Sequence, residues 1–259
     1  MKIIREPKVY IVGRQVADQA DVDRFLHEHG LAWETDTEVG AEALSEIGGR
    51  LCYMSFGTGR KSNKAYLEHL IEMGHGSVLE HAVWNLLFTG ISRSCTHELV
   101  RHRAGFGYSQ LSQRYVDESD TDFIEPDIVA EDAELHALWV EACETTHRIY
   151  CELVEKLVPR VTALYPDEPK TARRKMARQA ARSVLPNATE TKIFVTANAR
   201  ALRHFIEMRA NPAAEVEIRK LAVAVLRVMQ AESPNLFADY EIYVLPDGTE
   251  AAKTPHRKV

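Results

Sequence analysis

Residues 131–158, "EDAELHALWVEACETTHRIYCELVEKLV", carry the longest helical pattern in this chain of 259 residues. Apolar residues recur along one side of the helix that this stretch predicts, and they are Leu135, Leu138, Trp139, Ala142, Ile149 and Leu153. We expect Pro159 to follow the end of the helix, because a proline inside a helix removes a hydrogen bond and clashes with the preceding turn.

Shorter patterns on both sides of this stretch decide the fold class. Helical spacing or capping signals occur at 42–55, 63–73, 92–103, 169–184, 198–210 and 215–232. Residues that favour strands occur at 8–16, 82–92 and 240–248. Because strands and helices do not alternate regularly, the sequence predicts an α+β fold in which several long helices surround a small mixed sheet.

Glycine and serine residues predict where some of these helices begin and end. We expect the pair Gly48–Gly49 to break the helix at 42–55. The next helix should end in a loop that carries His75 and Ser77, because glycines stand on both sides of His75. Ser92 is placed to cap the helix that follows the strand at 82–92.

The composition is that of an ordinary soluble globular protein, with 45% hydrophobic and 27% charged residues. No apolar run approaches the roughly 20 residues of a membrane span, and the first 16 residues lack the apolar stretch of a signal peptide. We therefore expect a cytoplasmic protein that forms one domain over residues 1–259. Its four cysteines include no CxxC pair, which favours reduced and buried thiols.

The formal net charge of −6 argues against a surface built throughout to hold nucleic acid, so positive charge must act locally. It gathers at 101–103, 172–184 and 198–209. The first segment opens the stretch "RHRAGFGYSQLSQRY", residues 101–115. Cations near a helix C-terminus would account for Arg101 and Arg103, but not for the hydroxyls and amides that follow them. Those groups suit a phosphate and the edge of a base, so the stretch favours a nucleotide ligand.

Two other kinds of catalytic site fit single features of the same region. A metal ion could use Cys95, His97 and His102, but residues two apart do not share a helix face, and we expect no metal site. Cys95 could act as a nucleophile, but no recognisable Cys/His arrangement surrounds it.

A binding module is the alternative from another functional class. It would hold single-stranded nucleic acid by the charge of segment 101–115 and by stacking of bases on Phe106, Tyr108 and Tyr115. The negative net charge of the whole chain disfavours this alternative. A flavin spectrum of the purified protein would distinguish it from an enzyme.

Four segments together resemble the motifs of the flavin-dependent thymidylate synthases. That family has RHR followed after seven or so residues by S-x-R, and here eight residues separate Arg101–Arg103 from Ser112–Arg114, so we expect a bulge at Gly105–Gly107. "GHGSVLEH" (74–81) resembles GH-x-[ST]-x-x-EH. "ARSVLP" (181–186) and "NARALRHFIEMR" (198–209) resemble R-x-x-LP and N-A-R. The segments follow the family's order over residues 74–209.

The resemblance implies an enzyme that converts dUMP to dTMP. It implies FAD as the hydride carrier, methylenetetrahydrofolate as the carbon donor and NADPH as the reductant, in a homotetramer whose active sites are shared between subunits, with neither nucleic acid nor membrane as a partner. A guanidinium that stabilises the ionised N3/O2 edge of uracil would push electron density onto C5 without a covalent nucleophile. A catalytic cysteine is then not required.

The resemblance also assigns residues, motif position by motif position. The expected FAD contacts are Ser77, Arg101, His102, Arg103, Gln110, Asn198, Arg200 and His204. The expected dUMP contacts are Glu98, Leu99, Val100, Arg101, Gln110, Leu111, Ser112, Gln113, Arg114, Arg182 and Arg209. Among these, Ser112 and Arg114 would face the phosphate, and Arg209 would be the catalytic group that activates uracil. His75 would lie near flavin and folate, Glu80 and His81 would be structural or supporting, and Gln110 stands where many relatives have Glu.

One inference comes from helix geometry. Nine positions separate Arg200 from Arg209, and at about 100° per residue the two side chains point to opposite sides of one helix. If Arg200 and His204 contact a flavin and Arg209 a nucleotide, the ligands are most simply shared between subunits. The alternative is that the helix ends before 209 and leaves Arg209 free to turn.

Overall fold

The structure is a computed structural model that describes residues 1–259. Its fold is α+β, which confirms the predicted class. The helices are α1 (Gln19–Glu28), α2 (Gly40–Tyr53), α3 (Asn63–Glu72), α4 (Arg93–Leu99), α5 (Asp127–Ala130), α6 (Ala133–Leu164), α7 (Lys170–Ala181), α8 (Ala199–Arg209), α9 (Val216–Glu232) and α10 (Pro234–Phe237), with 3-10 helices η1 (Gly76–His81) and η2 (Arg182–Val184). The strands are β1 (Ile3–Ile4), β2 (Lys8–Arg14), β3 (Val83–Ser92), β4 (Phe106–Gln110), β5 (Phe123–Ile124), β6 (Glu190–Asn198), β7 (Glu241–Val244) and β8 (Glu250–Lys253).

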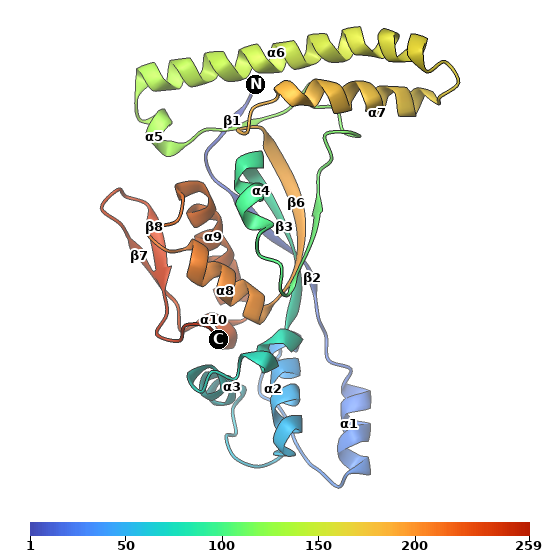
Figure 1. Cartoon of the computed structure of the whole chain (residues 1–259). Coiled ribbons are helices and arrows are strands. Elements are labelled where there is room, and N and C mark those ends of the chain that lie inside the picture. The colour runs from blue at the N-terminus through green and yellow to red at the C-terminus, as the bar shows by residue number, and fades with distance from the viewer. The chain divides into compact units, whose positions relative to one another are not determined.

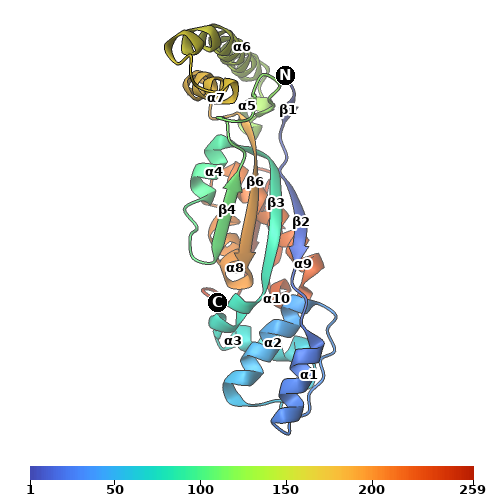
Figure 2. The same cartoon turned by 90° about the vertical axis from the view of Figure 1, so that its right-hand side faces the viewer.

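The largest sheet has four strands in the order β2-β3-β6-β4, which Figure 2 shows side by side. β1 pairs with β5 in parallel, and β7 pairs with β8 antiparallel. The chain forms two compact units. The first unit comprises Met1–Pro7, Thr89–Glu98 and Ser109–Ile193, and the second comprises Lys8–Phe88, Leu99–Tyr108 and Phe194–Val259. That the whole chain acts as one domain stays a prediction.

The first unit contains the long helix that the sequence predicts, α6, which lies beside α7 (Figure 1). The expected end before Pro159 is wrong, because α6 continues through this proline to Leu164. Burial of Val161, two residues beyond the proline and 9% exposed, offsets the missing hydrogen bond. The buried side of α6 runs through Cys143 and Tyr150, whereas Leu138 of the expected apolar side is 63% exposed.

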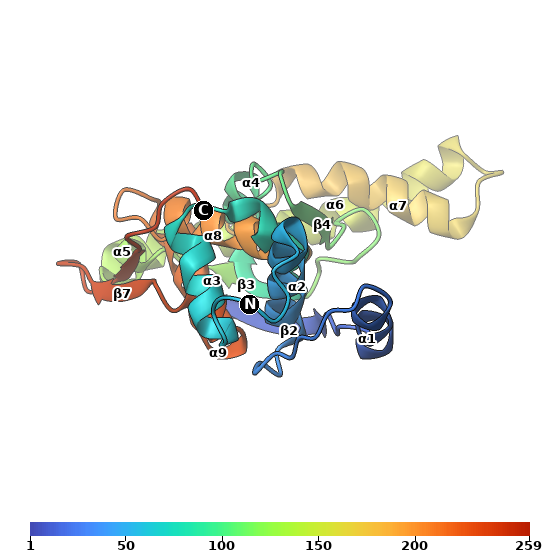
Figure 3. The same cartoon turned by 90° about the horizontal axis from the view of Figure 1, so that it is seen from below.

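In the second unit, α2 lies between α1 and α3 (Figures 1 and 3). The prediction that Gly48–Gly49 breaks this helix is wrong, since α2 is continuous through both residues. A Cβ atom at Gly48 would lie 2.8 Å from His81 Cδ2, and one at Gly49 would lie 2.7 Å from the Tyr66 hydroxyl. The glycines therefore allow close packing against these rings rather than ending the helix.

The core of the second unit is formed by α8 against α9. Leu202, Phe205 and Ile206 of α8 are almost completely buried, as are Leu221 and Leu226 of α9. The amphipathic pattern at 215–232 predicts α9, and Glu215 caps it by accepting hydrogen bonds from the backbone of Glu217 and Ile218. This packing fixes α8, which carries several of the candidate site residues.

Candidate functional site

The first candidate group lies in the second unit, around the ring of His102. The Tyr108 hydroxyl lies 3.0 Å from the Leu99 carbonyl oxygen and 2.8 Å from that of His102, and it holds this turn after α4. Three rings surround the imidazole, with centroids 6.1 Å away for Phe106, 5.2 Å for Phe205 and 5.9 Å for His204. Residues that are far apart in sequence thus fix one histidine side chain.

His102 also contacts the residue predicted to be catalytic. Arg209 Nε donates a hydrogen bond of 3.0 Å to His102 Nε2. Burial, followed by electrostatic repulsion from Arg209 and His204, lowers the pKa of His102 to about 4. The imidazole is therefore neutral near pH 7 and accepts this bond. The positive charge expected for the RHR stretch comes from its two arginines, both exposed, and not from the histidine between them.

Helix α8 presents two candidate residues on opposite sides. It begins where Asn198 Oδ1 accepts a hydrogen bond of 2.8 Å from Ala201 N, and it ends at Arg209, so the alternative of an earlier end is wrong. Arg200 Nη1 donates to Glu80 Oε1 at 2.6 Å, whereas Arg209 bonds to His102. The two arginines therefore have different partners, as the nine-residue spacing predicts.

His75 lies in the expected loop, as the residue that precedes η1, whereas the prediction is wrong for Ser77, which is already inside η1. This short helix forms because it buries Val78 and Leu79, which are 7% and 0% exposed. A Cβ atom at Gly76 would lie 3.0 Å from Arg200 Nε, a tight contact that glycine avoids. Ser77 remains exposed beside it.

A turn lies directly after the RHR motif, in the segment that leads to S-x-R. Phe106 N donates to Arg103 O at 3.1 Å, and Gly105 has a φ of +73°. A side chain at Gly105 would also come within 2.7 Å of the Asn198 amide nitrogen. The expected bulge at 105–107 is therefore a turn that requires glycine at 105.

The second candidate group lies in the first unit, on the segment Gln110–Arg114. Gln110 Nε2 donates to the hydroxyls of Thr96 and Thr191 at 3.1 and 3.3 Å. Leu111 is held through its backbone, which donates to Lys192 O at 2.9 Å and accepts from Arg93 Nη1 at 3.2 Å. Gln113 is buried, and the turn from Ser112 to Val116 is closed by backbone hydrogen bonds.

Cations gather around this turn. Lys175 Nζ lies 4.7 Å from the centre of the Tyr115 ring, and Arg178 donates to Tyr115 O at 2.8 Å. Arg114 Nε is buried without a hydrogen-bond partner. The charge of Arg182 contributes to lowering the pKa of Arg93, although burial is the larger cause. The arrangement suits a phosphate group.

Sequence reasoning named Arg182 from this basic region but missed Lys175 and Arg178. The signal was present, because positions 175, 178 and 182 are spaced by three and four residues and share one side of a helix. Arg93 was also missed, since it lies outside every motif.

No contact in the structure supports the alternatives based on metal or thiol chemistry. No group of three or more His, Cys, Asp or Glu side chains is placed to hold a metal ion. Cys95 is 3% exposed, and its backbone N–H donates to Ser92 Oγ at 3.0 Å, which confirms Ser92 as the cap of α4. None of the helices has the length and apolar character that a membrane span requires.

Comparison with known proteins adds an independent result. The model of the family described as "Thymidylate synthase complementing protein" matches residues 35–235. A flavin-dependent thymidylate synthase from Mycobacterium sp. (strain JLS) is 56% identical over 227 residues, which cover 86% of this chain and 89% of that protein. Proteins of the same name from Mycobacterium bovis (strain BCG / Pasteur 1173P2) and Mycobacterium tuberculosis (strain ATCC 25177 / H37Ra) are 51% identical over 235 residues, which cover 89% of this chain and 92% of each relative.

The chain belongs to the flavin-dependent thymidylate synthase family. The residues that the motifs of this family assign are divided between the two units. Those in the second unit are His75, Ser77, Leu99, Val100, Arg101, His102, Arg103, Asn198, Arg200, His204 and Arg209, and those in the first are Glu98, Gln110, Leu111, Ser112, Gln113, Arg114 and Arg182. All but one of the expected FAD contacts, Gln110, therefore lie in the second unit.

The donor set of the second unit fits the cofactor of this family. Ser77, Arg103, Arg200 and His204 expose a hydroxyl, two guanidinium groups and an imidazole. Such groups suit the pyrophosphate and hydroxyls of a dinucleotide. Leu99 differs from the exposed residues of this set, because it is completely buried and its carbonyl oxygen already accepts hydrogen bonds from the Tyr108 hydroxyl and the His102 backbone.

Proposed function

We propose that this enzyme methylates dUMP reductively to dTMP with FAD as its cofactor. The observation that carries the proposal is the 51–56% identity, over most of the chain, to proteins named flavin-dependent thymidylate synthase. Methylenetetrahydrofolate would supply only the one-carbon unit and NADPH the reducing equivalents. Atoms balance, since the methylene carbon, one hydride and one proton convert dUMP to dTMP and release tetrahydrofolate.

Arg209 is proposed as the group that activates uracil. Its guanidinium would stabilise negative charge on the N3/O2 edge of the ring, and that charge makes C5 a better nucleophile toward the methylene carbon. The hydrogen bond to neutral His102 and the position at the end of α8 support this role. A planar, permanently charged fork suits the task better than an ammonium group does.

The segment Ser112–Arg114 is proposed to hold the nucleotide phosphate. Arg114, Arg182 and Lys175 would provide charge, and the Ser112 hydroxyl would add a donor. The buried Arg114 Nε without a partner supports a ligand here, because such donors are normally satisfied. Gln110 is proposed to contribute its carbonyl oxygen, since its amide nitrogen already donates to two threonines.

Ser77, Arg103, Arg200 and His204 are proposed to bind FAD, together with Arg101, His102, Gln110 and Asn198 from the family motifs. When bound, FAD supplies hydride transfer, which no amino-acid side chain can perform. The protein residues bind and orient the cofactor by charge-assisted hydrogen bonds. His75 would lie where flavin and folate approach each other.

The finer features of the assembly belong to the same proposal. We propose a homotetramer in which residues of more than one chain complete each active site, and the opposite directions of Arg200 and Arg209 on α8 support it. One domain over residues 1–259 and a cytoplasmic location are also proposed. Binding of single-stranded nucleic acid gains no support from the comparisons, and the rings of Phe106 and Tyr108 stack on each other with centroids 5.6 Å apart, which covers one face of each.

The test separates cofactor binding from chemistry. The purified protein should show a flavin spectrum close to one FAD per chain, and it should form dTMP from dUMP, methylenetetrahydrofolate and NADPH. Arg209→Lys should retain FAD and its reduction by NADPH but form dTMP at least about 100-fold more slowly. Arg227→Lys, at an exposed arginine that pairs with Glu250, is the matched control and should behave as the wild type. A colourless protein with salt-sensitive oligonucleotide binding would contradict the proposal.

A further inference from the structure

We propose that His102 is a positioning residue that sets the orientation of the Arg209 guanidinium by accepting a hydrogen bond from its Nε. The inference rests on the proposed function, in which Arg209 activates uracil. It goes beyond that function in assigning His102 a task of its own, in addition to the cofactor contact that the family motif implies.

The place of Arg209 in the fold gives the hydrogen bond at its Nε a clear effect. It is the last residue of α8, and Ala210 after it has already left helical geometry. A helix end alone does not hold a long side chain, and an arginine side chain loses about 2 kcal/mol of rotamer entropy when it is fixed. A hydrogen bond at Nε fixes the rotation of the guanidinium plane, and with it the directions of the terminal N–H groups.

His102 can serve as a rigid anchor because its own position is determined on several sides. Its carbonyl oxygen contacts the Tyr108 hydroxyl at 2.8 Å, and its backbone N–H donates to Leu99 O at 3.1 Å. The rings of Phe106 and Phe205 lie against the imidazole. The position of His102 Nε2 is therefore fixed, and the Arg209 side chain must adopt the conformation that brings its Nε–H to this acceptor.

The bond requires an unprotonated Nε2, and the surroundings secure it. The charged or titratable groups that face the ring are Arg209 and His204, both on α8, and Tyr108 lies against its backbone. Arg101 and Arg103 flank it in sequence. Arg209 and the two flanking arginines are cations, so a protonated imidazole would be repelled as well as unable to accept. His102 thus offers a neutral acceptor in a positively charged region.

The test uses two substitutions that differ only in where an acceptor lies. His102→Gln places an amide oxygen near the position of Nε2, whereas His102→Asn ends near the position of Nδ1 and cannot reach Arg209. We expect His102→Asn to lower the single-turnover rate of dTMP formation at saturating dUMP by about 10- to 100-fold. His102→Gln should restore most of that loss. Bound FAD and its rate of reduction by NADPH should be equal in the two variants.

A double-mutant cycle and a structural readout complete the experiment. In the Arg209→Lys background, His102→Asn should cost less than about 3-fold, because the group that it orients is gone. The Nε–H resonance of Arg209 should exchange slowly with water in the wild type and in His102→Gln, and rapidly in His102→Asn. Equal losses for the Gln and Asn variants, additive effects in the cycle, or an unchanged Arg209 resonance would each overturn the proposal. An inactive wild type would instead contradict the proposed function, while the resonance would still test the bond.

Discussion

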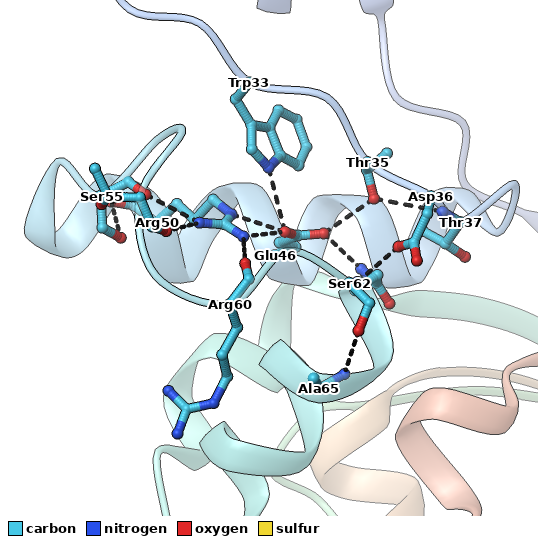
Figure 4. Close-up of polar contacts among 12 residues, drawn as sticks. Trp33, Thr35, Asp36, Thr37, Glu46, Arg50, Ser55, Arg60, Ser62 and Ala65 are labelled. Carbon is cyan, nitrogen blue, oxygen red and sulfur yellow. Dashed lines mark hydrogen bonds and ion pairs between the residues drawn. The ribbon is translucent and has the colours of Figure 1, made fainter.

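Replacing Arg50 by Met should remove the centre of a buried polar network in the second unit (Figure 4). The Arg50 side chain is 3% exposed and forms an ion pair with Glu46 at 2.7 Å, one turn earlier in α2. Its terminal nitrogens donate to the carbonyl oxygens of Ser55, Thr58 and Arg60 at 2.7–3.0 Å. A single guanidinium therefore joins α2 to the loop that leads into α3.

The expected loss is dominated by the buried pair. Removing one partner of a buried ion pair typically costs 3–5 kcal/mol, because the remaining charge is left without compensation. Glu46 keeps three other donors, Trp33 Nε1, Thr35 Oγ1 and Asn63 Nδ2, which places the cost at the lower end. The three loop carbonyls are partly accessible to water and add a fraction of a kcal/mol each. We expect Arg50→Met to lower the free energy of unfolding by about 4 kcal/mol.

Urea denaturation followed by tryptophan fluorescence, at one fixed protein concentration, measures this change. Arg50→Lys is the matched variant, since it keeps the charge toward Glu46 but cannot reach all three carbonyls. It should lose about 2 kcal/mol. A stability of Arg50→Met within about 1 kcal/mol of the wild type, with an unchanged dependence on urea, would show that the network contributes little.

Three further predictions concern other parts of the second unit. Gly49→Ala should lower the free energy of unfolding by about 1–2 kcal/mol in the same assay. The cost of steric overlap between the new Cβ atom and the Tyr66 hydroxyl exceeds the roughly 1 kcal/mol gained in helix propensity. A more stable variant would contradict this packing. The pKa of His102 is lowered to about 4 in the folded protein, so between about pH 4 and 6.5 the unfolded state binds a proton at this histidine more readily than the folded state does. The free energy of unfolding should therefore fall by up to about 2 kcal/mol as the pH drops through that range. His102→Gln should lack this part of the pH dependence, and equal pH profiles of the two proteins would refute the prediction. Glu207→Ala should remove the carboxylate that accepts hydrogen bonds from Arg257 Nε and Lys258 N. Trypsin should then cleave within residues 253–258 several-fold faster, as measured by mass spectrometry. An unchanged cleavage rate would show that Glu207 does not hold this segment.

Patterns that depend on near neighbours in sequence predict much of this structure. The 3.6-residue spacing at 215–232 predicts α9, and the apolar positions 67, 70 and 71 of α3 are buried as their spacing indicates. Strand β6 was missed although its sequence contains residues that favour strands, Ile193, Phe194, Val195 and Thr196. The family motifs in the sequence are sufficient to identify the stretch 101–115 and positions 200 and 209 as candidate site residues.

The sequence by itself determined the family, the α+β class, the positions of the main helices and the motif residues, because periodicity, capping and motif spacing are properties of nearby residues. Only the tertiary structure decided that Gly48–Gly49 lies inside α2, that α6 continues through Pro159 and that the imidazole of His102 is neutral. Each depends on tertiary contacts. The Tyr66 and His81 rings need the space of a missing Cβ atom, burial outweighs the hydrogen bond lost at Pro159, and an arginine 107 positions away makes His102 an acceptor. Close approach and desolvation arise only when such groups meet, so no local pattern in the sequence could contain them.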